Sequence, residues 1–447
     1  MEIKVSKILE VTNGKLYSGE TNFTVSDFSN DTRKIKANDV YVGIKGENFD
    51  GSLFYEKAFE NGATVALLDK DVEESLKPSD KTIILVDDTR KALADLASWK
   101  IDELNIPVIG ITGSVGKTST RDIIYSVVSK KYKAFKTKKN YNNDIGLPMT
   151  ILSIKDEEIA VLEMGMNHLF EISHLSNIAK PDIAVITHIQ PVHIEFLGTI
   201  ENILKAKMEI LEGLKKDGHF IFNNDSVHLR EVPKGNLNTI SCGINYESDL
   251  QAINITEDEF TLKYQGDEIK FKHQNLTLPF IQNILFAVAV GIIHEIPFNE
   301  IGEAINDFQL TEGRLEHIEL DNNILLVNDA YNACSASMKN AIDYIGKQKG
   351  QRKIAIFGNM AELGDYAEEL HTEVGKYINE NNLDQLFTVG HDAKHIFDHA
   401  TLINKKHFNN KDELFEILKD FIQPNDAIII KASNGAKFID IVDYLTK

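Results

Sequence analysis

The chain has 447 residues, too many for a single ordinary hydrophobic core, so its length predicts two or three domains. Its hydrophobic fraction of 43% and charged fraction of 26% are those of an ordinary globular protein. The formal net charge of −20 argues against nucleic acid as a partner, because duplex binding needs a field of Lys and Arg side chains. Positive charge for any anionic substrate must therefore be concentrated locally.

Membrane insertion and disulfide bonding are not expected either. No stretch approaches the run of about 20 apolar residues that a membrane-spanning helix needs. The first four residues lack the basic and then apolar layout of a secretion signal. The two cysteines, Cys242 and Cys334, lie far apart and in no metal-ligand spacing, which excludes a disulfide framework and a cysteine-based zinc site. We therefore expect a cytoplasmic protein.

The first predicted domain covers residues 1–99. Short β-rich runs such as residues 39–44 alternate there with helical stretches such as residues 54–61. This pattern predicts a small α/β domain.

The second predicted domain covers residues 100–311. Residues 106–112 are short, apolar and β-branched, which is typical of a buried strand, and a glycine turn follows them. Residues 159–162 and 182–187 have the same character and alternate with helical patterns. Such alternation predicts a mainly parallel sheet with helices on both faces. Residues 223–267 are rich in short strands, and we interpret them as an insertion in this domain.

The third predicted domain covers residues 312–447. Its expected buried strands are residues 353–358, 385–389 and 427–431. Helices are expected between them, near residues 370–379 and 411–421. This is the pattern of a Rossmann-like unit, so the whole chain is predicted to be an α/β protein of three domains.

A glycine-rich turn stands where the first central strand meets a helix. Gly113 and Gly116 let backbone N–H groups point into one concavity, to which the helix N-terminus adds its positive dipole. Lys117 would reach the β- and γ-phosphates of ATP, and Thr118 could place its hydroxyl on Mg²⁺. The long motif G-x-x-x-x-G-K-[ST] is not met because Ile111 replaces its first glycine, whereas T-G-x-x-G-K-T-[ST] is met fully. A plain glycine turn would not need the Lys-Thr pair. The predicted ATP-binding residues are Gly113, Ser114, Val115, Gly116, Lys117, Thr118 and Ser119.

Several stretches carry a resemblance to a known family. The short phosphate loop is the ATP motif of the Mur ligases, and four further stretches resemble that family in its order along the chain. They are N-Y-N-N-D-I-G-L-P (140–148), E-M-G-M-N-H (163–168), N-D-A-Y-N-A (328–333) and G-N-M-A-E-L-G (358–364). Residues 31–33 and 46–51 resemble the UDP-sugar domain of the same family. The resemblance is greatest to the members that add D-alanyl-D-alanine.

The resemblance implies an ATP-dependent amide ligase of peptidoglycan precursor synthesis. The implied acyl donor is UDP-N-acetylmuramoyl-tripeptide, which ATP would convert to an acyl phosphate. The implied amine is D-alanyl-D-alanine, which would attack that acyl phosphate. The three domains would bind the UDP-muramoyl-peptide, ATP and the incoming amine in that order, in a monomeric enzyme.

The predicted metal site lies at the carboxyl edge of the central sheet. Glu163 follows a buried strand next to the phosphate loop, where open α/β sheets collect their ligands, and its carboxylate suits Mg²⁺. A charged residue that merely ends a strand is the alternative. The resemblance implies that His193 is a further ligand and that two Mg²⁺ ions bind, with Thr118 and Lys207 completing the set.

Lys207 lies on the apolar stripe of an expected helix at residues 199–211. It follows Ile200, Ile203 and Leu204 by seven, four and three residues. A lysine on a buried face is costly unless it snorkels to solvent or changes its chemistry. In Mur ligases the lysine of this Ala-Lys-x-Glu context is carbamylated by CO₂, so the resemblance implies that carbamylated Lys207 supports the second Mg²⁺. A snorkelling lysine is the alternative.

The remaining site residues rest on the resemblance alone. Arg314 matches the family's arginine at the hinge before the third domain, where it could neutralise ATP phosphates after domain closure. With Lys117 and Lys207 it forms the implied catalytic set. The implied nucleotide contacts also include Asn283, Asp329 and Asn332. The implied substrate contacts are Asp31, Thr32 and Arg33 for the UDP-sugar, and Asn142 and Asn143 near ATP and the acceptor pocket.

Four segments depart from the family pattern. Residues 137–140 lose a glycine, and residues 332–338 read N-A-C-S-A-S-M where the family has N-A-N-P-D-S-M. The adenine-side motif at residues 280–286 and the C-terminal motif at residues 431–435 are also altered. Two alternatives therefore stay open: a related ligase that joins a different amine to a different carboxylate, and a non-catalytic scaffold that binds nucleotide.

Overall fold

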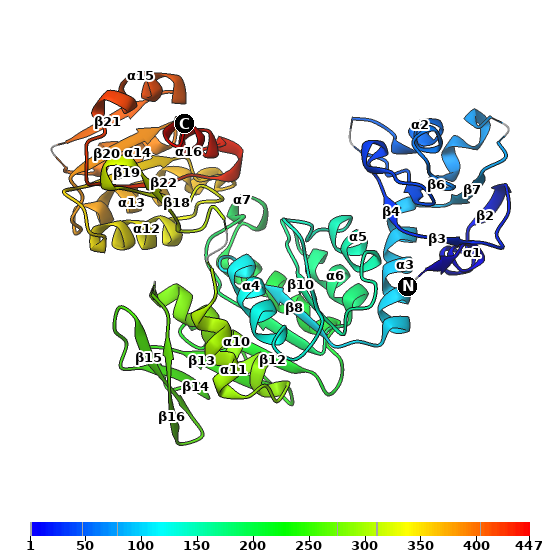
Figure 1. The fold of residues 1–447 in the computed structure, drawn as a ribbon, viewed down its shortest axis with the longest axis horizontal. Coiled ribbons are helices and arrows are strands. Elements are labelled where there is room, and N and C mark those ends of the chain that lie inside the picture. The colour runs from blue at the N-terminus through cyan, green and yellow to red at the C-terminus, as the bar shows by residue number, and fades with distance from the viewer. Residues whose placement is uncertain (1, 47, 78, 275, 310–311, 403) are drawn as a thin grey trace.

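Figure 1 shows the protein as a computed structural model, which describes residues 2–46, 48–77, 79–274, 276–309, 312–402 and 404–447. Within these ranges the strands form four hydrogen-bonded sheets, and the three larger ones follow one another along the chain. The predicted three-part α/β fold class is confirmed. The predicted end of the central domain, Thr311, lies outside the described residues. No helix in the described ranges combines the length and apolar character that a membrane crossing requires.

The N-terminal unit is built on a sheet with the strand order β2-β7-β6-β5-β4. Strands β4 to β7 are parallel, whereas β2 is antiparallel to β7 and β1 pairs with β3 beside the sheet. Strands β6 and β7 are buried along their whole length, as expected for apolar strands covered on both faces. The elements, with 3-10 helices labelled η, are β1 (Ile3–Lys4), α1 (Val5–Thr12), β2 (Lys15–Ser18), β3 (Thr24–Val25), β4 (Phe28–Ser29), η1 (Thr32–Lys34), β5 (Val40–Val42), η2 (Gly51–Phe54), α2 (Tyr55–Glu60), β6 (Val65–Asp69), η3 (Lys70–Ser75) and β7 (Thr82–Val86).

Helix α3 (Thr89–Leu104) connects the N-terminal unit to the central unit (Figure 1). Asp88 caps its first turn by accepting hydrogen bonds from the backbone N–H groups of Arg90 and Lys91, at 2.7 and 3.1 Å. The buried Lys100 donates from Nζ to the carbonyl of Leu152 at 2.5 Å, which ties α3 to helix α5 (Gly146–Leu152) of the central unit. The boundary predicted between residues 99 and 100 thus falls inside one continuous helix.

The central unit contains the largest sheet of the described residues, in the order β16-β15-β14-β13-β12-β11-β8-β10-β9. Strands β8 to β14 run parallel, and β15 and β16 are antiparallel. The elements other than α5 are β8 (Val108–Thr112), α4 (Lys117–Val128), β9 (Ala134–Lys136), β10 (Ile159–Glu163), α6 (Glu171–Ala179), β11 (Ile183–Ile186), α7 (Ile194–Leu197), α8 (Ile200–Met208), η4 (Glu209–Glu212), β12 (His219–Asn223), α9 (Val227–Glu231), β13 (Asn238–Gly243), β14 (Leu250–Ile253), β15 (Glu259–Tyr264), β16 (Asp267–Lys272), α10 (Leu278–Ile293) and α11 (Phe298–Asn306).

The prediction that residues 223–267 form an insertion is wrong. Strands β13 to β16 continue the central sheet outward from β12, each paired with the strand before it. The physical reason is that the outer edge of β12 presents unpaired N–H and C=O groups that the next strand can satisfy. The sequence of a short strand does not specify the sheet edge with which it will pair.

Alternate residues of the parallel strands pack into two separate cores, one on each face of the central sheet. Val108 and Leu162 belong to the core that contains helix α6, whereas Ile109 and Val161 belong to the core that contains α4 and α10. Successive side chains of a strand point to opposite faces, so apolar residues at every position require helices on both sides. The carboxyl ends of the strands stay open between these layers, and the site lies there.

The C-terminal unit has the strand order β17-β18-β22-β19-β20-β21, in which only β17 is antiparallel among the described strands. In Figure 1 this unit and the N-terminal unit lie on opposite sides of the central unit. The elements are β17 (Glu316–Leu320), η5 (Asp321–Asn323), β18 (Ile324–Asn328), α12 (Ser335–Lys347), β19 (Arg352–Gly358), η6 (Gly364–Tyr366), α13 (Ala367–Ile378), β20 (Gln385–Val389), α14 (Ala393–His399), β21 (Lys405–Phe408), α15 (Lys411–Phe421), β22 (Asp426–Lys431), η7 (Asn434–Ala436) and α16 (Ile439–Leu445).

Candidate active site

A cleft of about 2710 Å³ is lined by residues of both the central and the C-terminal unit. The phosphate loop, the ends of β10 to β13 and the start of α10 line it from one side, and the end of β18 and helix α12 line it from the other. A pocket for one small molecule usually measures roughly 300–1000 Å³. The cleft therefore has room for more than one ligand, at the edge where open α/β sheets bind them.

The phosphate loop turns sharply between β8 and α4. Gly113 has φ +145° and Gly116 has φ +85°, and a Cβ atom on Gly113 would lie 2.0 Å from the hydroxyl of Thr187. Ser114 fastens the loop to the segment after β11, because its N–H donates to the carbonyl of His188 at 2.8 Å and its hydroxyl to that of Gln190 at 2.9 Å. The free N–H groups of the first turn of α4 are thereby held at the cleft, as an anion site requires.

Lys117 supplies the cation of this loop. Its Nζ donates to the carbonyl of Gly113 at 2.7 Å and lies 3.4 Å from that of Ser114. The surrounding atoms lower the pKa of the ammonium group, because they desolvate its charged form. The side chain keeps some exposure to the cleft. An anion bound there would stabilise the charge that burial disfavours.

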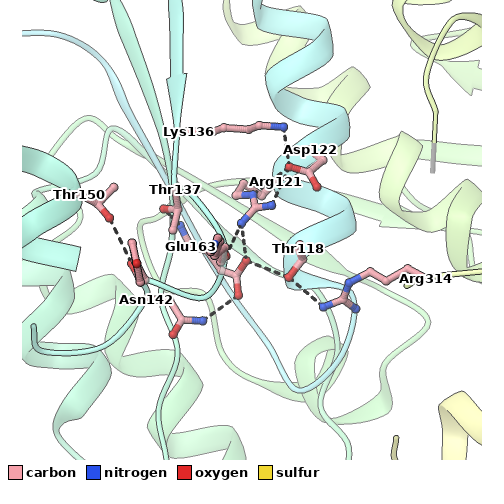
Figure 2. Close-up of polar contacts among 11 residues, drawn as sticks. Thr118, Arg121, Asp122, Lys136, Thr137, Asn142, Thr150, Glu163 and Arg314 are labelled. Carbon is pink, nitrogen blue, oxygen red and sulfur yellow. Dashed lines mark hydrogen bonds and ion pairs between the residues drawn. The ribbon is translucent and has the colours of Figure 1, made fainter. Parts of the chain in front are cut away.

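Glu163 is the last residue of β10, and its carboxylate is held by three donors from two segments, helix α4 and the loop that carries Asn142 (Figure 2). Oε2 accepts from the hydroxyl of Thr118 at 3.0 Å and lies 3.3 Å from Nη1 of Arg121. Oε1 accepts from the amide of Asn142 at 2.8 Å, and the backbone N–H of Glu163 donates to the hydroxyl of Thr137 at 3.0 Å. The residue is only 3% exposed, so these contacts fix its orientation.

The donors at this point fit Mg²⁺. A carboxylate and a hydroxyl that lie within 3.0 Å of one another offer hard oxygen atoms, and Mg²⁺ is commonly held by one or two protein oxygens together with phosphates. The structure thus brings Thr118 and Glu163 together, as the predicted metal site requires. Their binding of metal stays a prediction.

His193, a predicted metal ligand, is turned toward the C-terminal unit. It precedes α7 with φ +60°, and its Nδ1 contacts the carboxylate of Glu362. This contact holds the pKa of the Glu362 carboxyl below its usual range. The described residues contain no group of three or more His, Cys, Asp and Glu side chains that could hold a metal ion. The metal role of His193 stays a prediction.

Lys207 is buried on α8 at 1% exposure, and no hydrogen-bond partner for its Nζ is found in the described part of the chain. The snorkelling alternative is therefore wrong, because snorkelling would bring Nζ to solvent. Desolvation is the main cause that lowers the pKa of Lys207 far below its usual value, and repulsion from the nearby Lys117 adds to it. The predicted helix ends early, at Met208, and continues as η4.

The C-terminal unit contacts the phosphate loop through Arg314. Its Nη2 donates to the hydroxyl of Thr118 at 2.9 Å, and its guanidinium lies 4.3 Å from the ring centroid of Tyr331. The carboxylate of Asp329 accepts from the N–H of Leu315 at 3.2 Å and from Nζ of Lys431 at 2.6 Å. The two predicted residues, Arg314 and Asp329, thereby lie together in the wall of the cleft that the C-terminal unit forms.

Asn332 belongs to the same wall, since its carbonyl accepts from Nζ of Lys431 at 2.9 Å. Asn283 lies on α10 beneath the phosphate loop, where its Oδ1 accepts from the hydroxyl of Thr120 at 3.0 Å. Of the predicted asparagine pair, Asn142 binds Glu163, whereas Asn143 accepts from the N–H of Gly146 at 2.8 Å at the start of α5. All four asparagines line the cleft.

The segment predicted to hold the UDP-sugar does not contribute to this cleft. Arg33 donates from Nε and Nη2 to the two carboxylate oxygens of Asp31, at 2.9 and 3.0 Å. Hydrogen bonding from Arg33 lowers the pKa of Asp31 to about 2. The carbonyl of Thr32 accepts from Asn61 at 2.8 Å. Arg33 is 87% exposed on the N-terminal unit, and the substrate role of these residues stays a prediction.

Sequence reasoning missed three charged residues beside Glu163. Arg121 donates from Nη2 and Nε to Oδ1 of Asp122 at 2.8 and 3.0 Å, and Lys136 donates to the same oxygen at 2.9 Å. Lys431 was likewise not singled out as a site residue. A signal for the first pair exists in the sequence. Arg121 and Asp122 are adjacent opposite charges in the helix that the phosphate loop opens, and they come directly before the apolar residues Ile123 and Ile124.

Comparison with known families finds three matching models. Residues 25–100 match "Mur ligase family, catalytic domain", residues 111–291 match "Mur ligase middle domain" and residues 313–434 match "Mur ligase, glutamate ligase domain". The chain is 37% identical to the UDP-N-acetylmuramoyl-tripeptide–D-alanyl-D-alanine ligase of Bacillus subtilis, over 99% of this chain and 98% of that protein. It is 30% identical to the enzyme of the same name from Escherichia coli, over 100% of this chain and 98% of that protein.

Solved structures give the same picture. A crystal structure of MurF from Acinetobacter baumannii superposes with a TM-score of 0.91 at 27% identity, covering 100% of this chain and 99% of that one. The MurF ligase from Thermotoga maritima, solved in complex with ADP, superposes with a TM-score of 0.84 at 28% identity, over 94% and 97% of the two chains. The similarity thus spans all three units together.

Proposed function

Because this chain belongs to the Mur ligase family, we propose that it joins D-alanyl-D-alanine to UDP-N-acetylmuramoyl-tripeptide with consumption of ATP. The product would be a peptidoglycan precursor, released with ADP and phosphate. The observation that carries this proposal is the contact of Thr118 with Glu163 at the phosphate loop, which Arg314 reaches from the other unit. We assign the UDP-sugar to residues 1–99, ATP to residues 100–311 and the amine to residues 312–447.

Amide formation from a carboxylate requires that the departing oxygen become a good leaving group. Transfer of the γ-phosphoryl group of ATP to the carboxylate gives an acyl phosphate. The amine attacks its carbonyl carbon, and phosphate departs. The N–H groups of the phosphate loop and Lys117 hold the phosphates in line for this transfer, since these donors are in place before the reaction begins.

Thr118 and Glu163 would hold Mg²⁺, which disperses negative charge on the transferring group when bound. Asn142 and Arg121 keep the Glu163 carboxylate oriented toward the phosphate loop. Arg314 adds a positive charge from the C-terminal unit. The two units therefore both contribute to the site, since Arg314 reaches the hydroxyl of Thr118 at 2.9 Å.

We extend the proposal to carbamylation of Lys207. A buried amine without a hydrogen-bond partner and with a lowered pKa is nucleophilic, so its nitrogen can attack CO₂ and release a proton. The product is an anion, which the nearby Lys117 and a second Mg²⁺ would stabilise. Lys207→Ala should lose activity that short carboxylic acids restore. Failure of that rescue, or an absent carbamate signal after ¹³CO₂ labelling of the wild type, would count against carbamylation.

The decisive assay is phosphate release from ATP and Mg²⁺ with UDP-N-acetylmuramoyl-tripeptide, with and without D-alanyl-D-alanine. We expect release that needs both substrates and a pentapeptide product by mass. Release with the donor alone would redirect the search to another amine. Bound ATP without any turnover would favour a nucleotide-binding scaffold. We place the reaction in the cytoplasm, because Cys242 and Cys334 are both free thiols.

A further inference from the structure

Arg121 occupies a buried position between the phosphate-loop helix and the metal-site carboxylate (Figure 2). Its side chain is 5% exposed. Nε and Nη2 are both bound to Asp122, and Nη1 is shared between Oε2 of Glu163 at 3.3 Å and the carbonyl of Lys139 at 3.0 Å. One guanidinium therefore joins helix α4, the end of β10 and the loop that carries Asn142.

The arrangement is balanced in charge. Arg121 and Lys136 contribute two positive charges, and Asp122 and Glu163 contribute two negative ones. Burying charges in a protein is costly unless they are paired and fully hydrogen-bonded, and removal of one partner leaves another uncompensated. A group with this arrangement therefore keeps its members in fixed positions.

Arg121 contacts two carboxylates at different distances. Its contact with Asp122 is 2.8 Å, whereas its contact with Glu163 is 3.3 Å. The shorter contact anchors the guanidinium, and the longer one orients Oε2 of Glu163 without saturating it. Oε2 thus stays available for a cation that also meets Thr118.

The same guanidinium controls the second support of Glu163. Lys139, whose carbonyl binds Nη1, has φ +52° and lies three residues before Asn142 in the same loop. Asn142 holds Oε1 of Glu163 at 2.8 Å. Loss of Arg121 would remove its contact with Oε2 and release the loop that places Asn142 on Oε1, so each oxygen of the carboxylate would have a support removed or loosened.

We propose that Arg121 is a positioning residue, which holds the Glu163 carboxylate and the 139–142 loop in the geometry that accepts a metal–nucleotide complex. This inference rests on the metal role of Glu163 in the proposed function. It predicts that Arg121 acts on metal binding and on turnover through Glu163, without touching a substrate. Groups that orient a metal ligand typically change metal affinity or activity by roughly 10–100-fold when removed.

The test measures Mn²⁺ binding to the full chain with ADP by electron paramagnetic resonance, together with kcat and KM. Arg121→Met should weaken Mn²⁺ binding about tenfold or more and lower kcat more than it raises KM for ATP. Arg121→Lys keeps the charge but cannot make all the contacts of the guanidinium, so it should recover only part of the Mn²⁺ affinity that Arg121→Met loses. If the single variant does not fold, Arg121→Met combined with Asp122→Asn removes the internal pair together and keeps the charge balanced.

Arg352→Met is the matched control. Arg352 makes an equivalent pair with Asp426 at 2.6 Å and also binds a backbone carbonyl, that of Phe421 at 2.9 Å, in the C-terminal unit. It should lower the thermal midpoint but leave Mn²⁺ binding unchanged. The inference would be overturned if folded Arg121→Met bound Mn²⁺ as tightly as the wild type. It would also be overturned if Arg121→Met and Arg352→Met lost Mn²⁺ affinity equally. The wild type could also fail to catalyse the ligase reaction while its Mn²⁺ binding still depends on Arg121. In that case the proposed function fails and the inference stands.

Discussion

The phosphate-loop edge of the central sheet and the Asp31–Arg33 segment of the N-terminal unit both pair arginine with a carboxylate, but in opposite ways. At the central edge, Glu163 is nearly fully buried, and its partners Thr118 and Arg121 lie 45 and 42 residues away in the chain. In the N-terminal unit, Arg33 is exposed and its partner is two residues away. A buried pair leaves an uncompensated charge when broken, whereas an exposed pair is replaced by water. The two regions should therefore respond very differently to mutation.

The largest effect is expected at Lys117. Lys117→Met should lower phosphate release by at least about 10³-fold, because it removes a cation already placed against the transferring phosphates. Stopped assays with saturating ATP would measure it. Lys270→Met, at an exposed lysine of β16, is the control and should leave the rate unchanged. A Lys117 variant with a tenth of the normal rate would contradict the assigned role.

Glu163→Gln should follow, with a loss of about 10²-fold in kcat and a higher Mg²⁺ requirement. The change is isosteric, so Oε1 can still accept from Asn142, but the charge that faces Arg121 and Thr118 is lost. Titration of activity with Mg²⁺ would separate the two effects. Equal Mg²⁺ requirements in the variant and the wild type would remove Glu163 from the metal site.

Arg314→Met should raise KM for ATP about tenfold, since a hydrogen bond to a charged group contributes roughly 1.5–3 kcal/mol. The effect is smaller than at Glu163 because Arg314 reaches the loop from the other unit. Tyr331→Phe is the matched control, because it keeps the aromatic face on which the guanidinium lies. A KM for ATP that does not change in Arg314→Met would show that the hinge contact does not serve the nucleotide.

The smallest effect is expected at Arg33. Arg33→Ala should raise the pKa of Asp31 from about 2 toward its ordinary 3.8, measured by carboxyl NMR. A carboxyl whose pKa is lowered by folding stabilises the folded state above 3.8, and this contribution is lost as the pH falls toward 2. Because the pair is exposed and screened by salt, we expect the thermal midpoint at pH 7 to change by at most about 2 °C. A larger change would mean that this surface pair behaves like the buried one.

Much of the fold could be predicted because its strands carry their own signal. The apolar runs of β8, β10, β20 and β22 are buried on both faces, so burial in the sheet is evident from the letters alone. The place of strands β13 to β16 in the central sheet could not be predicted, because the sequence of a short strand does not specify the strand with which it pairs. Sheet order places β8 between β10 and β11, and this order depends on how the helices pack.

The sequence by itself determined the features that depend on adjacent or periodic residues: the phosphate loop, the carboxylate at the end of β10 and Lys207 on the apolar stripe of α8. Only the tertiary structure decided what these groups touch. Arg314 meets Thr118 across 196 residues of chain, His193 meets Glu362 of another unit, and Arg121 joins three segments. Periodicity is a local property of the backbone, whereas such contacts depend on the packing of whole layers and units against one another.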